Sequence, residues 1–422
     1  MPAPTPADLA IWTIAVLATL GVLIRPRGWP EAVWAVAGAL LLPALSLLPP
    51  AAAWHALARG ANVYLFLFGM MLLAELARRE GLFDWLAALA ALRARGSPRR
   101  LFALIYAVGT LVTMLLSNDA TAVVLTPAVA AVARAARAAP LPYLFICAFI
   151  ANAASFTLPI SNPANLVVFG NHLPPLAQWL ARFALPSVVA VAVTFAVLRL
   201  TQRRALMGTI ARAVPVPRLS AGARLAGAGI LLTAAALLGA SAAGVALGAP
   251  TAIAAILTVS AALARERRAP WALLRGVPWG ILPLVAGLFV LVAGVDRTGV
   301  LAELGRALQS AAHLRRGALW EVGIATALAS NLTNNLPLAL AAGTTLGASP
   351  LPAALGSAVL VGVDLGPNLS VTGSLATILW LIALRREGQQ VGAARFLRLG
   401  VCVMSPALLL ALAAIRLQHL HG

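Results

Sequence analysis

The chain has 422 residues, of which 61% are hydrophobic and only 10% charged, so an ordinary soluble domain is excluded because too little polar surface would remain. Its net charge of +19 comes from 31 basic residues, all of them arginine. These arginines lie in short segments between apolar runs, which is typical of the positive-inside rule rather than of nucleic-acid binding. We therefore expect an all-α polytopic membrane protein with no nucleic-acid partner.

Ten apolar runs are long enough to be predicted as membrane spans, and two further stretches are apolar but interrupted by polar residues. No arginine precedes the first run, so we interpret it as a span rather than as a signal peptide. The predicted spans are residues 8–24, 30–48, 61–77, 143–170, 179–198, 225–246, 250–264, 278–295, 350–384 and 396–415, and the interrupted stretches are 101–133 and 317–348.

The arginines also predict the topology. If both interrupted stretches enter and leave the membrane on one side, all but seven of the arginines fall on a single face. A full crossing by either stretch would place arginine-rich loops on both faces, so we predict two re-entrant hairpins, an outside N-terminus and a cytoplasmic central loop. The seven exceptions are Arg59, Arg182, Arg297, Arg306, Arg315, Arg316 and Arg416.

A weak internal duplication relates the two halves of the chain. Gly69 and Gly81 have the same spacing as Gly287 and Gly299, and a predicted amphipathic interfacial helix follows each second glycine, LFDWLAALAAL in one half and VLAELGRAL in the other. The arginine count gives the halves opposite orientations. We predict two inverted repeats of six elements, each with a re-entrant hairpin and a broken transmembrane helix, at 1–198 and 225–422, joined by a basic cytoplasmic linker at 199–224.

Four polar clusters lie within this apolar sequence, one in each hairpin and one in each broken span. An unsatisfied polar group in hydrocarbon costs several kcal/mol, so we expect the clusters to meet inside the bundle. Inverted repeats with helices broken at matching positions are typical of secondary transporters, which bind substrate where the breaks meet. The clusters run from Ser117 to Asp119, from Ser161 to Asn165, from Ser330 to Pro337 and from Asp364 to Ser374.

The clusters contain two carboxylates, Asp119 and Asp364. A carboxylate inside a span is rare and usually functional, and burial favours its neutral form, which suits a group that binds and releases a proton. A structural role is the alternative for both: a salt bridge or helix cap for Asp119, support of the broken backbone for Asp364. The amide-rich run from Ser330 suits a small polyoxo solute or a dehydrated cation, with helix–helix hydrogen bonding as its alternative.

The sequence lacks the motifs that are typical of enzymes and of metal-binding or nucleotide-binding proteins. Cys147 and Cys402 lie in apolar runs and have neither disulfide nor metal-site spacing. The sequence contains no HExxH motif and no GxxxxGK[ST] phosphate loop. We therefore expect no enzymatic activity, no metal site and no cofactor.

Three motifs resemble the ArsB arsenite/antimonite permease family of the ion transporter superfamily, and the resemblance extends over essentially the whole chain. They are SNDATAVVLTPAV at 117–129, SNLTNNLPLALAAG at 330–343 and GVDLGPNLSVTGSLATILWL at 362–381. The resemblance implies a scaffold domain and a transport domain. Together with the carboxylates inside the spans, it leads us to expect Asp119 as the main proton carrier, with Asp364 assisting it or having a structural role. It implies substrate binding by Ser117, Asn118, Thr121, Ser161, Asn162, Asn165, Asn331, Thr333, Asn334, Asn335, Thr372 and Ser374.

The predicted function is export of As(III) and Sb(III) hydroxides in exchange for protons by alternating access. Dicarboxylate transporters of the superfamily commonly have Ser-Asn-Thr where this chain has Ser-Asn-Asp, and the carboxylate disfavours an anionic substrate. The alternatives are a sodium-coupled carboxylate transporter or sodium/proton antiporter of the same superfamily, a passive channel, and a membrane anchor for a soluble ATPase docked on the basic linker. Membrane lipid is an expected partner, and a homodimer remains open. Arginine-only basic usage with high alanine indicates a GC-rich bacterial genome, and hence the bacterial inner (plasma) membrane.

Overall fold

The computed structural model describes residues 4–170, 173–212, 214–314, 317–348 and 351–420, and every regular element in these ranges is a helix. Seven of the described helices are long and apolar enough to cross a membrane, and α15 joins them when it is counted with α16 across a bend of 73°. The prediction of an all-α polytopic membrane protein is therefore confirmed. Arg315 and Arg316, which the topology placed outside, lie beyond the described residues.

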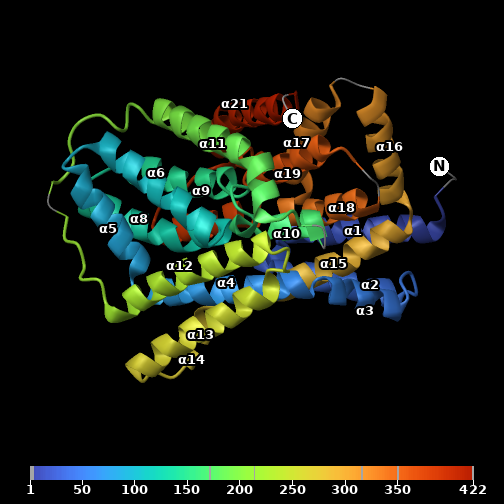
Figure 1. Ribbon diagram of the computed structural model, residues 1–422, viewed down its shortest axis with the longest axis horizontal. Coiled ribbons are helices and arrows are strands. Elements are labelled where there is room, and N and C mark those ends of the chain that lie inside the picture. Colours follow the sequence, from blue (N-terminus) through green and yellow to red (C-terminus); the bar gives the residue numbers. More distant parts are fainter. Residues whose placement is uncertain (1–3, 171–172, 213, 315–316, 349–350, 421–422) are drawn as a thin grey trace.

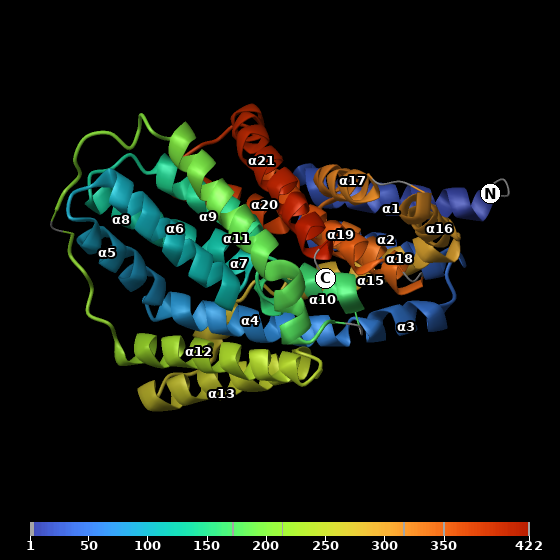
Figure 2. The same ribbon diagram turned by 45° about the horizontal axis from the view of Figure 1, so that its top comes forward.

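Eight helices pack mainly with one another and form what we call the scaffold group. Within it α13 runs along α4, α15 runs along α2, and α12 and α13 form one edge of the molecule (Figure 2). The group takes its helices from both halves of the chain. Its members are α1 (Pro6–Ile24), α2 (Glu31–Ala44), α3 (Pro50–Arg59), α4 (Ala61–Arg79), α12 (Ala221–Ala242), α13 (Gly248–Glu266), α14 (Trp271–Gly276) and α15 (Ile281–Arg297).

The remaining helices form the transport group, in which α11 and α21 lie side by side (Figure 1). It also takes helices from both halves, so neither half of the chain is a separate packing unit. The members are α5 (Leu82–Ala94), α6 (Pro98–Leu115), α7 (Asn118–Ala120) with a π-helical turn at Thr121–Leu125, α8 (Thr126–Ala135), α9 (Leu141–Ala153), α10 (Pro163–Phe169), α11 (Leu176–Thr201), α16 (Val300–Leu314), α17 (Ala318–Thr333), α18 (Asn335–Ala348), α19 (Ala353–Leu365), α20 (Leu375–Arg386) and α21 (Ala393–Leu420).

Both interrupted stretches form helical pairs, and both predicted broken spans are broken. The first pair consists of α6 and α7–α8, which both contact α9, and the second consists of α17 and α18. Residues 154–162 separate α9 from α10, and residues 366–374 separate α19 from α20, with a short 3₁₀ turn in each gap, at Pro159–Ser161 and Gly366–Asn368. Proline opens α10 and lies inside the second gap, where a missing N–H cannot continue a helix.

The glycine pairs of the predicted duplication occupy matching places in the fold. Gly81 separates α4 from α5 with φ 74°, and Gly299 separates α15 from α16 with φ 79°, a backbone region that glycine enters at little cost. A Cβ at Gly69 would lie 2.7 Å from the backbone of α13, and one at Gly287 would lie 2.7 Å from the backbone of α2. These matches favour the duplication, while the inversion across the membrane stays a prediction.

The helix predicted after Gly81 is α5, and its position at the membrane interface stays a prediction. One face of this helix packs against α6 and α8 in the transport group, while Asp84, Leu92 and Arg93 are exposed. The buried residues follow helical spacing and are Phe83, Ala87, Ala88, Ala90, Ala91 and Ala94. Two short helices, α3 and α14, were not predicted from the sequence because they are shorter than a membrane span.

The basic linker between α11 and α12 is attached to the transport group. The Ile210 amide donates to the Gly96 carbonyl at 3.1 Å, and the Ala211 amide donates to the Ala136 carbonyl at 2.8 Å. These two bonds hold the linker against the loops that follow α5 and α8. It is therefore part of the folded structure and not a free tether.

Candidate functional site

Each of the four polar clusters supplies the residue that caps a helix, which is why polar side chains occur at these points in apolar sequence. Ser117 Oγ accepts from the Ala120 amide at 3.2 Å, and Asn162 Oδ1 accepts from the Ala164 amide at 3.0 Å. Ser374 Oγ accepts from the Thr377 amide at 3.1 Å. Asn334 Oδ1 lies 3.4 Å from the Leu336 amide and caps α18. All four caps are among the predicted site residues.

The tip of the first hairpin is held by hydroxyl groups. Thr121 Oγ1 lies 2.8 Å from Thr113 Oγ1 and donates to the Ser117 carbonyl at 3.3 Å. Asn118 is buried, and its Oδ1 accepts from the backbone amide of Asp119. The Asp119 side chain is half-buried, and its carboxylate has no hydrogen-bond partner in the described part of the chain. The Asp119 carboxylate therefore does not cap a helix, which was one of the two structural alternatives to a functional role.

The tip of the second hairpin is bound to the gap between α19 and α20. Asn331 Nδ2 donates to the Gly366 carbonyl at 3.0 Å, while its Oδ1 accepts from Ser370 Oγ at 2.7 Å. Thr372 Oγ1 donates to the Asn331 carbonyl at 3.0 Å. The Asn335 amide donates to the Gly373 carbonyl at 2.9 Å. A corresponding bond in the first half joins Ser161 Oγ to the Met114 carbonyl at 3.1 Å, so each hairpin contacts the break of its own half.

The two broken spans are joined to each other across the halves. Asn162 Nδ2 donates to Asp364 Oδ1 at 2.8 Å, and Ser374 Oγ donates to Asn152 Oδ1 at 3.2 Å. All four side chains are buried, Asp364 and Asn152 completely. In addition, α10 packs against α18 of the second hairpin, and α20 packs against the first hairpin. The clusters therefore meet inside the transport group, as the sequence predicted.

Two predicted binding residues are engaged within their own elements. Asn165 Nδ2 donates to the Ser155 carbonyl at 2.9 Å and to the Leu158 carbonyl at 3.1 Å, so it holds the first break in shape. Thr333 Oγ1 donates to the Ala329 carbonyl of its own helix at 3.0 Å. Neither side chain bonds to a residue of another cluster, and the same is true of Ser117, Asn118 and Thr121 in the first hairpin.

Three buried polar residues of this network were not among the predicted binding residues: Asn152 and Thr377, which lie outside the predicted clusters, and Asn368, which lies inside the fourth. Asn152 Nδ2 donates to Asn368 Oδ1 at 3.0 Å, and Asn368 Nδ2 donates to the Phe149 carbonyl at 3.0 Å. Thr377 Oγ1 lies 2.9 Å from Ser374 Oγ. One signal was available, because Asn152 precedes Asn162 by the same spacing that separates Asp364 from Ser374.

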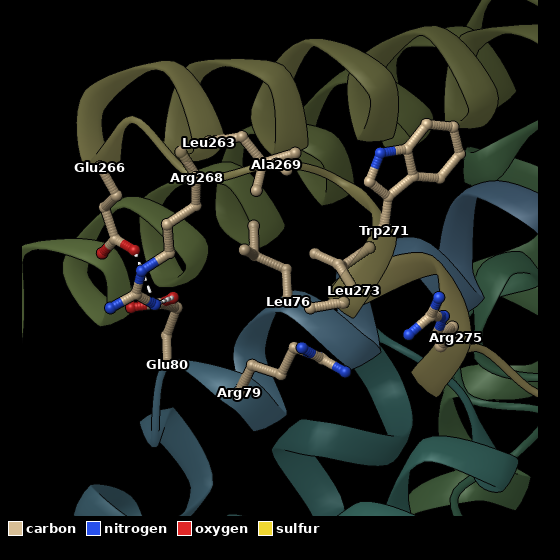
Figure 3. Close-up of a pocket in the computed structure, with 12 residues that line it drawn as sticks. Leu76, Arg79, Glu80, Leu263, Glu266, Arg268, Ala269, Trp271, Leu273 and Arg275 are labelled. Carbon is tan, nitrogen blue, oxygen red and sulfur yellow. Dashed lines mark ion pairs between the residues drawn. The ribbon is translucent and has the colours of Figure 1, made fainter.

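Two surface pockets lie outside these clusters. The first, about 670 Å³, is lined by α4, α13 and α14, with Leu76 and Leu273 between a charged group and Trp271 (Figure 3). Arg268 lies 2.9 Å from Glu266 and 3.7 Å from Glu80. Burial and the neighbouring Glu266 carboxylate raise the pKa of Glu80 above its usual value. The second pocket, about 660 Å³, is lined by Leu92, Arg93, Arg95 and Arg212, and no predicted site residue lines either one.

Ion pairs occupy most of the carboxylates near the helix ends. Glu75 contacts Arg78 and Arg79 at 2.7 and 2.6 Å, and Glu387 contacts Arg134 at 2.7 Å. Among the described residues, no group of three or more His, Cys, Asp or Glu side chains could hold a metal ion. The polar clusters therefore offer amide, hydroxyl and carboxyl oxygens as their chemistry.

Comparison with known proteins identifies the family. The sequence matches the Citrate transporter family, CitMHS, over residues 12–360. It is 26% identical to the arsenical pump membrane protein of Escherichia coli K12 over 430 residues, covering 96% of this chain and 97% of that protein. It is 28% identical to the arsenical pump membrane protein of Yersinia enterocolitica over 425 residues, covering 96% and 98%.

A solved structure shares the fold. The Alcanivorax borkumensis YdaH transporter, whose topology is described as unusual, matches 88% of each chain with a TM-score of 0.60 at 17% identity. The resemblance to arsenite permeases is confirmed by the curated relatives, which are named arsenical pump membrane proteins. With its apolar helices, the chain is a multi-pass membrane protein and belongs to the citrate transporter family.

Proposed function

We propose that this transporter exports As(III), and Sb(III) with it, as the neutral hydroxide in exchange for protons. The observation that carries the proposal is similarity to arsenical pump membrane proteins along nearly the whole chain. Inward movement of protons drives the metalloid outward by alternating access. The amide and hydroxyl groups of the four clusters bind the hydroxide, and Asp119 and Asp364 are the two carboxylates available for the proton.

The chemistry of the clusters supports a neutral solute. Residues 117–121, 161–165, 330–335 and 364–374 contain two aspartates and no arginine, lysine or histidine. An anion such as a di- or tricarboxylate would meet like charge there and find no cationic partner. Arsenous acid, in contrast, presents hydroxyl groups that both donate and accept, which matches side-chain amides. Neither cysteine lies in a cluster, so no thiolate would hold As(III) too tightly for release.

The membrane placement is part of the proposal. Loops rich in arginine, with the linker at 199–224 among them, face the cytoplasm of a bacterial inner membrane. The two halves, 1–198 and 225–422, are inverted repeats that alternate access to the clusters. Cysteine substitutions at Arg203 and Trp54, labelled with an impermeant maleimide in intact cells and in everted vesicles, test this placement. Labelling of both positions from the same side would contradict it.

A second function is favoured by the family description, which is that of citrate transporters. A citrate transporter of this fold would couple a carboxylate to sodium or protons. The absence of basic residues from the clusters argues against it, but the experiment must include it.

The deciding experiment measures As(III) uptake into everted membrane vesicles with an acid interior, with and without sodium. Proton-coupled export predicts uptake that collapses with a protonophore and does not need sodium. Citrate uptake in place of As(III) uptake would select the carboxylate transporter. Flux that never exceeds electrochemical equilibrium would select a passive channel.

A soluble ATPase docked on the basic linker is a separate proposal with its own test. Deleting the linker is unsuitable, because its backbone bonds to Gly96 and Ala136 hold it in the fold. Exchange of Arg203, Arg204 and Arg218 for glutamine removes charge without touching those bonds. Intrinsic gradient-driven transport should survive this change, whereas ATP-stimulated transport in the presence of a partner ATPase should fall.

A further inference from the structure

Asn152 and Asp364 occupy matching positions in the two broken spans. Each is the second-last residue of the first half-helix of its span, and each is completely buried. Each precedes, at the same spacing, the residue that caps the second half-helix, Asn162 in one span and Ser374 in the other. The two gaps, 154–162 and 366–374, are equally long. The two residues are therefore structural counterparts.

The counterparts form matching bonds, and each bond crosses to the other span. Asp364 Oδ1 accepts from the cap of the first span, Asn162, at 2.8 Å. Asn152 Oδ1 accepts from the cap of the second span, Ser374, at 3.2 Å. The pair of bonds thus joins the two broken spans at corresponding points.

The second polar atom of each side chain distinguishes the two. Asn152 Nδ2 donates to Asn368 Oδ1 at 3.0 Å, so this amide is satisfied. Asp364 Oδ2 is buried and makes no hydrogen bond in the described part of the chain. The neighbouring Ser155 hydroxyl donates instead to the Asn152 carbonyl at 2.8 Å. An ionised carboxylate in this place would leave an uncompensated charge in the protein interior, which is strongly unfavourable. A protonated carboxyl, in contrast, is neutral and has nearly the shape of the amide at the counterpart position.

The surroundings of Asp364 contain no partner that would neutralise a charge. Three of the elements packed against α19, namely α9, α10 and α18, have no Asp, Glu, Arg or His within their bounds. No ion pair or hydrogen bond joins Asp364 to any titratable group of its neighbours among the described residues. The titratable side chains on the neighbouring helices α9, α11, α17 and α21, none of which contacts Asp364 in this way, are Tyr143, Cys147, Arg182, Arg199, Glu321, Arg395, Arg398, Cys402, Arg416 and His419.

We propose that Asp364 takes up and releases the transported proton, and that Asn152 is its permanently neutral counterpart. The proposal rests on the proposed proton exchange and names the residue that performs it. Only an O–H bond at Asp364 Oδ2 forms and breaks: the proton enters from the outside and leaves to the cytoplasm. Ionisation strengthens the bond from Asn162, since a carboxylate is the better acceptor, and leaves the Ser374–Asn152 bond unchanged. The Asn162–Asp364 hydrogen bond between the spans thus responds to the proton, while the Ser374–Asn152 hydrogen bond does not.

Transport by the full chain in proteoliposomes tests this assignment with four variants. Asp364→Asn should lose As(III) accumulation driven by a pH gradient while still exchanging labelled for unlabelled As(III), at a reduced rate, because asparagine imitates the protonated state. The double variant Asn152→Asp/Asp364→Asn moves the carboxyl to the counterpart position and should regain accumulation. Asn152→Asp alone adds a second proton site and should change the number of protons per As(III). The control variant Asp84→Asn removes an exposed carboxyl of α5, outside the four clusters, and should keep accumulation.

Two results would overturn the proposal. Accumulation by Asp364→Asn at the wild-type level shows that Asp364 does not carry the proton. Failure of the double variant to accumulate As(III), with exchange intact, shows that Asn152 is not its counterpart.

A second measurement does not depend on As(III) at all. Infrared difference spectra of the purified protein between acid and alkaline pH should contain a protonated-carboxyl band that Asp364→Asn lacks and Asp119→Asn retains. If the wild type transports no As(III) but this band is present, the proposed substrate fails and the proton site stands. If the band persists in Asp364→Asn, the proton site fails whatever the substrate is.

Discussion

Replacing Gly362 by alanine should force α17 and α19 apart, since the two helices touch through their backbones at this point. A Cβ at Gly362 would lie 2.7 Å from the Gly323 carbonyl oxygen, 2.8 Å from Thr326 Cβ and 3.0 Å from the Ala327 amide nitrogen. Carbon contacts are normally about 3.5–4.0 Å, and backbone atoms cannot rotate away, so the helices must separate by about 1 Å. Overpacking of this kind costs about 1–3 kcal/mol.

Gly356 on the same helix is the matched control, because a Cβ there would meet nothing within 4 Å. Alanine favours a helix over glycine by about 1 kcal/mol at either position, so this gain cancels in the comparison. The Gly362→Ala protein should therefore be less stable than Gly356→Ala by about 1–3 kcal/mol. At about 2 °C per kcal/mol for a large chain, its Tm should lie roughly 2–6 °C lower.

Thermal unfolding in detergent measures this difference. A thiol-reactive fluorogenic dye reports exposure of Cys147, which is buried, in a background where the exposed Cys402 is replaced by serine. Equal Tm values for the two alanine variants would show that α17 and α19 are not in backbone contact at Gly362, and the packing of the second hairpin described above would be wrong.

Three further predictions use the same unfolding assay. Trp380→Phe removes the donor to the buried Leu144 carbonyl, a bond of 2.9 Å, and should cost about 1–3 kcal/mol, whereas an unchanged Tm would show that the bond is absent. Asn334 has φ 73°, so Asn334→Ala should be less stable than Asn334→Gly by about 1–2 kcal/mol, although both variants lose the same two side-chain hydrogen bonds, to Thr372 and Leu336; equal stability would contradict this backbone conformation. Since the pKa of Glu80 is raised, its contribution to stability is present at low pH and is lost as the pH rises above the usual range of glutamate, so wild-type Tm should fall over that range and Glu80→Gln should flatten the profile.

The features that the sequence predicted are those set by local chemistry and by the membrane. Apolar runs of sufficient length become helices because the backbone has no other way to satisfy its polar groups in lipid. Breaks appear where Ser117, Asn162 and Ser374 can cap a new helix, and where Pro367 prevents the old one from continuing. These signals lie within a few residues of the feature that they predict.

The features that were missed depend on partners far away in the sequence. Asn152 was unremarked because its bond to Ser374 spans 222 residues, and no local pattern gives that pairing. The partners of the buried face of α5, which are α6 and α8, likewise follow from the tertiary structure and not from the local sequence. The role of Asn165 in holding the Ser155 and Leu158 carbonyls requires the shape of the break itself. Matching the spacing of polar residues between the two halves would have found Asn152.

The length of the half-helices has a consequence for synthesis of the protein in the cell. With 13 residues, α9 is about 20 Å long, too short to cross a hydrocarbon core of about 30 Å by itself. The residue that satisfies Asn152 is made 222 residues later, and at about 5–20 residues per second the ribosome reaches it about 10–45 seconds afterwards. During that interval the first broken span holds unpaired amide groups at membrane depth. Its stable insertion therefore waits for the second half of the chain, and release of a chain truncated at the linker would expose it to membrane proteases.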